Sequence, residues 1–210
     1  NDFFLKDVRV SHHQTTFSVE KKGVSVGEFS LAVAGEHNAL NALAAIIVCL
    51  QAGLSLSQIQ KGLLAFRGSK RRLEFIGELV TGAKVYDDYA HHPTEIKKTL
   101  QTLRQQYPDK QIVCIFQPHT YSRTKMLFHE FQNAFTGIDK LFIVMTEIFA
   151  SSREKKDEFV SGAKLVEAIE HVQNNIYYRE TLVDVIKYIN EKAFGENTII
   201  VTMGAGDVYT

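Results

Sequence analysis

From about residue 83 to its end, the chain alternates between two hydrophobic patterns, and this alternation limits the folds open to it. Short apolar runs typical of buried strands are separated by segments in which apolar residues recur at helical spacing. The apolar runs occupy residues 83–90, 111–118, 140–148, 175–179 and 198–206. The helical segments occupy residues 94–107, 123–135, 161–172 and 181–194. Strands that alternate with helices pair in parallel through right-handed crossovers. We therefore predict an α/β fold with a mostly parallel sheet flanked by helices.

The first 68 residues are organised differently. Residues 1–33 are predicted to form short strands joined by turns, with a hairpin turn at Lys22-Gly23. Two helices are predicted next, over residues 37–53 and 54–66. Strands followed by two helices are typical of the end of a larger unit. We place the boundary between this unit, residues 1–68, and the next, residues 69–210, at the basic run SKRR.

Composition excludes several classes of protein. The chain has 24 basic and 24 acidic residues and a formal net charge of +0, which argues against binding nucleic acid or a membrane surface through bulk charge. No apolar run approaches the roughly 18 residues of a membrane span, and no signal peptide is recognisable. Cys49 and Cys114 each lie in an apolar run, which predicts buried, reduced thiols and a cytosolic protein.

Polar signatures follow three of the predicted strands. They are DDYAHH at residues 87–92, QPHTYSR at 117–123 and MGAGD at 203–207. In an open parallel sheet, ligands bind at the carboxyl ends of the strands. We therefore expect these three segments to lie along one edge of the sheet and to form the functional site.

The segment VYDDYAHHPTEI, residues 85–96, places two aspartates, a tyrosine and two adjacent histidines before a proline that begins a helix. Adjacent histidines cannot readily share one metal ion, and no HxxxH or CxxC pattern accompanies them. Contact with a substrate or a Mg²⁺-nucleotide is the favoured interpretation. A structural helix cap with a hydrogen-bonded histidine is the alternative.

Three further segments allow both a binding and a structural interpretation. Residues 119–125 place donors and cations at a helix start, which suits a carboxylate or phosphate but also a simple cap. Asn38 and Asn41 share a helix face beside His37 and suit an adenine edge, although asparagine also caps helices. Residues 68–72 form either a solvated linker or a phosphate clamp.

Five ordered segments together resemble the Mur ligases, over nearly the whole chain. They are GEHNALNALAA, FRGSKRR, VYDDYAHHPTEI, FQPHTYSRT and MGAGD. The pattern is most similar to the members that add L-alanine to UDP-N-acetylmuramate in bacterial peptidoglycan synthesis. The member that recycles murein tripeptide also has a DD-aromatic-AHHPT stretch and is the alternative, but FQPHTYSRT favours the L-alanine-adding members.

The resemblance implies a domain assignment. The family has an N-terminal UDP-binding domain, a central ATP-binding domain with a P-loop, and a Rossmann-like C-terminal domain that binds the amino acid. Residues 1–68 would be the tail of the central domain and residues 69–210 the C-terminal domain. The chain contains no GxxxxGK[ST]. It would therefore be a cytoplasmic, bacterial fragment, inactive alone, whose partner segments are the missing N-terminal and P-loop parts of the same enzyme.

The resemblance also implies roles for individual residues. The ATP-binding residues would be His37, Asn38, Asn41, Arg72 and Asp88. The L-alanine site would be formed by Tyr89, His91, His119 and Arg123. The catalytic residues would be Arg72, Asp88 and His91. The family often has a second arginine directly after the position of His119, and here Thr120 stands there, so Arg123 would pair the alanine carboxylate alone.

The chemistry implied is activation of the muramate carboxylate by phosphoryl transfer from ATP, followed by attack of the L-alanine amine on the acyl phosphate. ATP and Mg²⁺ would be the cofactors, with the principal Mg²⁺ ligands outside this chain and no metal ligand within it. The reaction needs charge neutralisation at the γ-phosphate, a closely placed amine and exclusion of water.

Other classes of protein stay open. The MGAGD segment allows a dinucleotide-binding oxidoreductase or a non-catalytic nucleotide-binding module, although a lone GxG after the last strand is a weak signal. The histidine pairs His12-His13 and His91-His92 allow a metal-storage module, although the first pair is predicted to lie in a loop.

Overall fold

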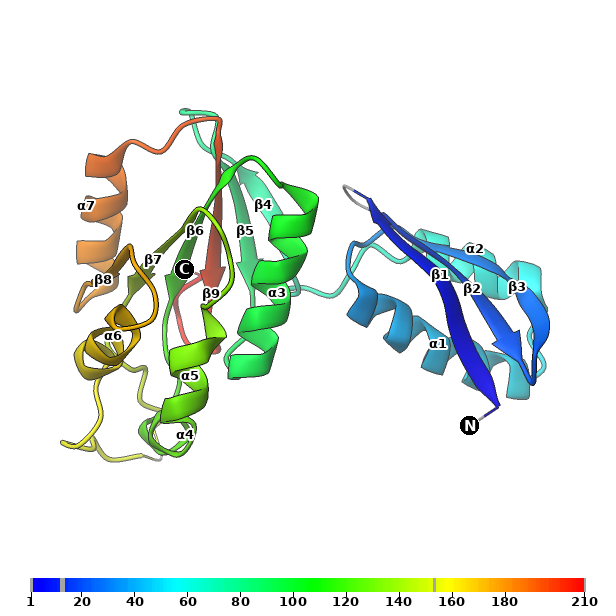
Figure 1. Ribbon diagram of the computed structural model, residues 1–210, viewed down its shortest axis with the longest axis horizontal. Coiled ribbons are helices and arrows are strands. Elements are labelled where there is room, and N and C mark those ends of the chain that lie inside the picture. Colours follow the sequence, from blue (N-terminus) through cyan, green and yellow to red (C-terminus); the bar gives the residue numbers. More distant parts are fainter. Residues whose placement is uncertain (1, 12–13, 153, 210) are drawn as a thin grey trace. The chain divides into compact units, whose positions relative to one another are not determined.

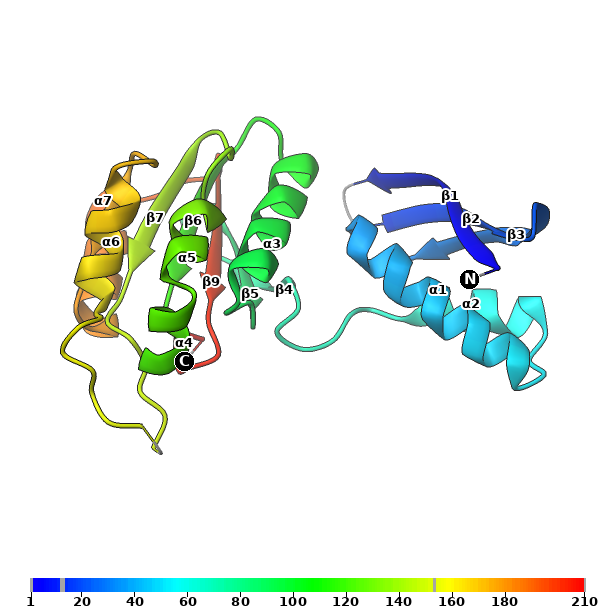
Figure 2. The ribbon, with the colours of Figure 1, turned by 60° about the horizontal axis from the view of Figure 1, so that its bottom comes forward.

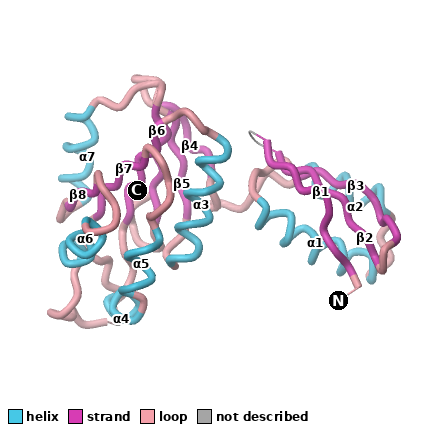
Figure 3. The backbone as a smooth tube through the Cα atoms, in the orientation of Figure 1, coloured by secondary structure: helices cyan, strands magenta, loops and turns pink. Residues whose placement is uncertain are grey.

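The computed structural model describes residues 2–11, 14–152 and 154–209, so His12 and His13 lie outside the described part of the chain. The described residues form two compact units, which divide between Ser69 and Lys70. Figure 3 shows the alternation of strands and helices along the second unit.

The first unit is a three-stranded antiparallel sheet, ordered β1-β2-β3, with two helices packed on it (Figure 1). Its elements are β1 Phe3–Ser11, β2 Gln14–Lys21, β3 Val24–Leu31, α1 Glu36–Gln51 and α2 Leu56–Ala65. Alternate residues of β2 point to one face, as the period of a strand requires. Phe17 and Val19 on that face share a core with Ala42 and Ile46 of α1 and Ile59 of α2.

Local sequence signals account for the turns and caps of this unit. Lys22 and Gly23 both have positive φ, 51° and 81°, as a tight hairpin turn requires. Gly53 follows α1 with φ 84°, the left-handed conformation that glycine adopts without a Cβ penalty. Ser55 is the N-cap residue of α2 and forms a capping box with Gln58.

The second unit is built on a six-stranded sheet ordered β4-β5-β9-β6-β7-β8. Its elements are β4 Glu74–Glu78, β5 Lys84–Asp88, α3 Pro93–Gln106, β6 Gln111–Phe116, α4 Tyr121–Met126, α5 Phe128–Ala134, β7 Leu141–Met145, α6 Gly162–Glu170, β8 Ile176–Tyr178, α7 Leu182–Lys192 and β9 Thr198–Met203. Strand β4 is antiparallel to β5, and every other neighbouring pair is parallel. The α/β fold with a mostly parallel sheet is confirmed.

Helices cover both faces of this sheet (Figures 1 and 2). Successive residues of a strand point to opposite faces, so Ile115 and Phe116 of β6 face different layers. Phe116 packs against Phe131 of α5 and against Phe135, the C-cap residue of that helix, with ring centroids 5.9 and 5.6 Å apart. Ile115 shares a core with Tyr188 of α7. Strands buried on both faces explain the nearly unbroken apolar runs of the sequence.

One predicted helix is divided. Residues 123–135 were expected to form a single helix, but α4 ends at Met126 and α5 begins at Phe128. Leu127 between them has φ −106° and ψ 24°, outside the helical region. Its amide still donates to the Arg123 carbonyl, and its carbonyl accepts from Phe131. Helical hydrogen bonding therefore continues across the break, which no glycine or proline marks in the sequence.

The sequence analysis also made predictions about membrane-spanning helices and about the two cysteines. No helix among the described residues is long and apolar enough to cross a membrane. Both cysteines are free, and Cys114 is buried as predicted. Cys49 is only partly buried, because it packs at the margin of the first unit's core.

Candidate functional site

The carboxyl ends of four parallel strands lie level with one another in the second unit. Asp88, the last residue of β5, pairs with Met203, the last residue of β9. Met203 pairs in turn with Phe116 at the end of β6, and Phe116 with Met145 at the end of β7. The segments that follow these strands therefore emerge along one edge, as the sequence predicts. This edge carries the three polar signatures.

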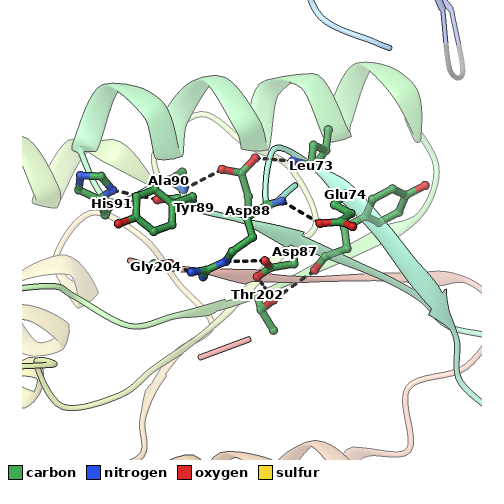
Figure 4. A network of polar contacts seen from close by, with 11 residues as sticks. Leu73, Glu74, Asp87, Asp88, Tyr89, Ala90, His91, Thr202 and Gly204 are labelled. Atoms are coloured by element: carbon green, nitrogen blue, oxygen red, sulfur yellow. Dashed lines mark hydrogen bonds and ion pairs between the residues drawn. The ribbon is translucent and has the colours of Figure 1, made fainter. Parts of the chain in front are cut away.

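The two aspartates of the first signature are buried and hold other parts of the protein (Figure 4). Asp88 accepts the Leu73 amide at one carboxylate oxygen, at 2.8 Å, and the Ala90 amide at the other, at 2.7 Å. Asp87 accepts the Thr202 hydroxyl at 2.7 Å. Both oxygens of Asp88 are thus engaged by the chain itself, which favours a positioning role for this carboxylate.

Burial raises the pKa of Asp88 above its ordinary value. The amides of Ala90 and Leu73 and the positive charge of Arg72 oppose this shift and stabilise the ionised form. The charge of Arg72 therefore acts on this carboxylate, although the Arg72 side chain is exposed.

Arg71 is a central member of this edge that sequence reasoning missed. Its Nε donates to Asp87 at 2.8 Å and its Nη2 to the Gly204 carbonyl at 2.7 Å. The guanidinium also lies over the rings of Tyr89 and Tyr209, 4.9 and 4.0 Å from their centroids. Arg71 thus joins the segment after the unit boundary to the ends of β5 and β9.

The backbone around Arg71 explains why its neighbour is exposed. Arg71 and Leu73 have positive φ, 55° and 49°, which is unusual for residues with a Cβ. The Arg71 carbonyl accepts the Tyr89 amide at 2.7 Å, and the Leu73 amide is held by Asp88. Hydrogen bonds thus hold the chain on both sides of Arg72, which is itself exposed to solvent, where a phosphate could reach it.

Tyr89 and His91 follow β5 at the same edge. Tyr89 is 40% exposed, and its ring meets the His91 ring edge-on with centroids 5.2 Å apart. His91 Nδ1 lies 2.8 Å from the Tyr89 carbonyl oxygen. A carbonyl only accepts, so this contact requires a proton on Nδ1 and leaves Nε2 as the acceptor nitrogen of the neutral ring.

His92 has the contacts of a helix cap. Its Nδ1 accepts the Thr94 amide, while Glu95 accepts the His92 amide, both at 3.3 Å. This reciprocal pattern satisfies amides at the start of α3, where Pro93 is the first residue. The structural interpretation of the adjacent histidines therefore holds for His92.

His119 and Arg123 complete the cluster from the next signature. The His91 and His119 ring centroids are 6.3 Å apart, and His119 stacks on Phe149 at 5.7 Å. Arg123 Nη1 lies 3.3 Å from His119 Nδ1. Burial lowers the pKa of His119, and the positive charge of Arg123 lowers it further. The cluster therefore combines a neutral imidazole with an arginine, beside the His91 ring.

The start of α4 has an acidic residue bound to it from a distant loop. Thr120, its N-cap residue, has φ 67° and makes no capping hydrogen bond with its side chain. Glu154 takes that role and accepts the Tyr121 amide at 2.7 Å and the Ser122 amide at 2.8 Å. The sequence gives no local signal for this contact, because 32 residues separate Ser122 and Glu154.

The third signature, MGAGD, packs against the second. A Cβ on Gly206 would collide with the side chains of Gln117 and Phe149. Gln117 also donates to Asp207 at 2.8 Å. A hollow of ≈ 360 Å³ lies beside this contact, between the ends of β6 and β7 and the start of α7. Gly206 of the MGAGD segment therefore allows close packing at this edge of the sheet. This packing explains the need for glycine at that position without a bound dinucleotide.

The candidate adenine contacts lie in the first unit. His37 and Asn41 are exposed on the first turns of α1, and the His37 ring folds over Gly35. Asn38 is half-buried and donates to the Ala34 carbonyl at 2.8 Å. Asn41 thus presents its amide to solvent, whereas Asn38 has a structural contact as well.

Within residues 2–11, 14–152 and 154–209, no group of three or more histidine, cysteine, aspartate or glutamate side chains could hold a metal ion.

The chain is similar to known proteins over nearly its whole length. The family model described as "Mur ligase, glutamate ligase domain" matches residues 71–206. The UDP-N-acetylmuramate–L-alanine ligase of Desulfitobacterium hafniense is 39% identical over 208 residues, covering 99% of this chain and 45% of the relative. The chain thus spans less than half of that relative's length.

Two solved structures show the same fold over almost the whole chain. The UDP-N-acetylmuramate–alanine ligase of Thermotoga maritima superposes with a TM-score of 0.82 at 32% identity, covering 99% of this chain and 43% of that one. A murein peptide ligase of Psychrobacter arcticus gives 0.63 at 26%, covering 98% and 42%. The family model matches the sequence from Arg71 to Gly206, which is more than half of the chain. The chain therefore belongs to the Mur ligase family.

Proposed function

We propose that this chain is the amino-acid-binding part of an ATP-dependent ligase that joins L-alanine to UDP-N-acetylmuramate in peptidoglycan synthesis. The observation that carries the proposal is the cluster of Tyr89, His91, His119 and Arg123 at one sheet edge. The name of the D. hafniense relative supports the choice of substrates.

The cluster suits a small amino acid. Arg123 offers a guanidinium, whose donors pair well with a carboxylate. His119 is kept neutral by its surroundings, so it adds a polar wall without competing for the carboxylate as a second cation. The ring of Tyr89 contacts His91 and the ring of Phe149 contacts His119, so these aromatic groups would limit the size of the bound amino acid.

His91 is placed to handle the proton of the amine. The contact of its Nδ1 with the Tyr89 carbonyl fixes the ring and leaves Nε2 as a proton acceptor. An ammonium group must lose a proton before it can attack an activated carboxylate. We assign that acceptor role to His91 Nε2, and the carboxylate contact to Arg123.

The nucleotide contacts follow the same logic. ATP supplies the phosphoryl group that activates the muramate carboxylate. Arg72, which is exposed, is assigned to its terminal phosphates, and Asn41, with His37 and Asn38, to adenine. Asp88 is assigned to holding the Arg72 segment rather than to direct contact with ribose. Mg²⁺ would accompany the phosphates of ATP, and its principal ligands are expected outside this chain.

The test uses the full-length enzyme. Arg123→Ala should raise the KM for L-alanine by roughly 10- to 100-fold and leave the KM for ATP unchanged, since one charge-assisted contact to the carboxylate is lost. Lys98→Ala, which removes an exposed cation from α3, is the matched control and should change neither. An unchanged KM for L-alanine in Arg123→Ala would refute the assignment. Ligation by the isolated 210-residue chain would refute the proposal that it is only part of the enzyme.

A further inference from the structure

Phe149 is fixed beside His119 by its backbone as well as by its ring. Its amide donates to the Pro118 carbonyl at 2.8 Å, and its carbonyl accepts the Thr120 amide at 3.0 Å. These two bonds form a parallel bridge between His119 and Phe149, beyond the ends of β6 and β7. The two rings stack with centroids 5.7 Å apart and an interplanar angle of 13°. The position of the Phe149 ring over His119 is therefore set by the extension of the sheet.

The same ring packs closely against the last segment of the chain. A Cβ built on Gly206 would lie 2.7 Å from Phe149 Cγ, which is too close for a real contact. Only a residue without a side chain therefore fits beside the ring at this place. With the Gly206 backbone and the His119 ring as close neighbours, the Phe149 ring has little freedom to move.

Phe149 also lines the hollow of ≈ 360 Å³ between the ends of β6 and β7 and the start of α7. That volume lies within the range of about 300–1,000 Å³ typical of pockets for small ligands. None of the four residues of the cluster assigned above to L-alanine lines this hollow. Phe149 thus borders the hollow and, through its stacking on His119, the cluster.

The described residues that line the hollow make it acidic. Three of them are acidic, Glu147, Glu180 and Asp207, and none is basic. Glu147 already accepts the Tyr178 hydroxyl, and Asp207 accepts Nε2 of Gln117. Glu180 is exposed to solvent just before α7. A ligand group that entered the hollow would therefore be favoured if it carried a positive charge.

Resting on the proposed function, we propose that Phe149 determines the selectivity of the enzyme for a small amino acid. With its carboxylate on Arg123, the amino acid lies beside His119, and the Phe149 ring closes the way from there to the hollow. L-Alanine, whose side chain is one methyl group, fits without displacing the ring. Shortening Phe149 connects the two spaces and lets a longer side chain extend into the hollow, where a positive charge at its end meets the acidic residues.

The test compares amino acids in the full-length enzyme and in its Phe149→Ala variant. We expect the variant to raise kcat/KM for L-lysine relative to L-alanine by roughly tenfold or more, since even one methylene that fits or clashes changes selectivity by roughly 10- to 200-fold. L-Glutamate, of similar length, should gain less, because its charge has the wrong sign. A lysine-to-alanine ratio that stays unchanged would overturn the proposal. A merely structural defect would lower the use of both amino acids together and leave the ratio as it was.

Three more variants keep the test decisive if Phe149→Ala folds poorly. Phe159→Ala removes an exposed phenylalanine of the same loop and is the matched control, which should leave the ratio unchanged. Phe149→Leu keeps an apolar side chain and should shift the ratio in the same direction by a smaller factor. Adding Glu180→Gln to either Phe149 variant should reduce the advantage of L-lysine over L-glutamate. An advantage that Glu180→Gln leaves intact would show that the side chain does not enter the hollow, and would overturn the proposal.

NMR on the 210-residue chain separates this proposal from the proposed function. The probe is n-butylammonium, which has the length and charge of a lysine side chain. We expect it to shift the Thr181 amide resonance, at the hollow, in both the wild type and Phe149→Ala. It should shift the His119 ring resonances in Phe149→Ala alone. This connection is tested even if the full-length enzyme fails to ligate L-alanine, a failure that would refute the proposed function. His119 resonances that respond equally in both chains, or in neither, would overturn the inference.

Discussion

Removing Arg71 should destabilise the second unit far more than removing its neighbour Arg72. Arg71→Ala takes away the Nε bond to Asp87 and the Nη2 bond to the Gly204 carbonyl. The side chains of Arg71 and Asp87 are 19% and 4% exposed, so the aspartate would be left charged and buried. Arg72→Ala removes an exposed side chain and is the matched control.

The magnitude follows from the burial of the pair. Breaking a buried ion pair by removing one partner costs about 3–5 kcal/mol, and the partial exposure of Arg71 places the expected loss near the lower end, at about 3 kcal/mol. For a unit of this size that corresponds to a fall in Tm of roughly 10 °C. Arg72→Ala should stay within about 0.5 kcal/mol of the wild type.

Two further variants separate the ion pair from backbone strain. Arg71→Gly should be less destabilising than Arg71→Ala by about 1 kcal/mol, because glycine adopts the φ of 55° without strain. In an Asp87→Asn background, Arg71→Ala should cost about 1 kcal/mol or less, since no charge is left unpaired.

Differential scanning calorimetry of the 210-residue chain and its variants measures these changes. The transition of the second unit is followed, and the first unit serves as an internal reference. The reasoning would be refuted by an Arg71→Ala variant that melts within about 2 °C of the wild type. It would equally be refuted by Arg72→Ala showing the same loss, because the distinction between the two arginines would then be absent.

Two other predictions concern the pKa of His119 and the packing of Gly162 against Thr146. NMR titration should give His119 a pKa below its ordinary 6.5, and Arg123→Ala should raise it, because that charge contributes to the shift. The sign follows from linkage: a lowered folded pKa makes stability rise with pH between the folded and unfolded values and stay constant above 6.5. Gly162→Ala should lose roughly 1–3 kcal/mol by thermal melting, because its Cβ would collide with the Thr146 carbonyl oxygen.

Local signals in the sequence predicted much of the fold. The apolar runs and helical spacing placed the strands and helices of the second unit in the right order, and the strand ends placed the polar signatures on one edge. The hairpin turn at Lys22-Gly23 was predicted from turn chemistry alone. Each of these features depends on residues that are close in sequence, and for that reason a single sequence is enough to predict it.

Features that depend on distant contacts could not be predicted in this way. Nothing in KRR indicates that Arg71 turns inward and Arg72 outward, because that choice is made by Asp87, Asp88 and Gly204 from two strand ends. The cap that Glu154 places on α4 likewise comes from a separate loop. The contacts of the aspartates with the Arg71 segment, and of Glu154 with α4, form only when the folded chain brings these distant segments together.

The residues at the carboxyl ends of the strands differ in whether the protein itself already binds their polar atoms. This difference changes how mutations of these residues should be interpreted. Asp88 has both oxygens bound by backbone amides, whereas Arg72 and Tyr89 are exposed. Asp87 and Asp88 therefore act mainly as structural residues, which hold the segment that exposes Arg72. Loss of activity on mutation of Asp88 would consequently not by itself show a nucleotide contact. Only a loss of ATP binding without a matching loss of Tm would do so, because a failed scaffold lowers both together.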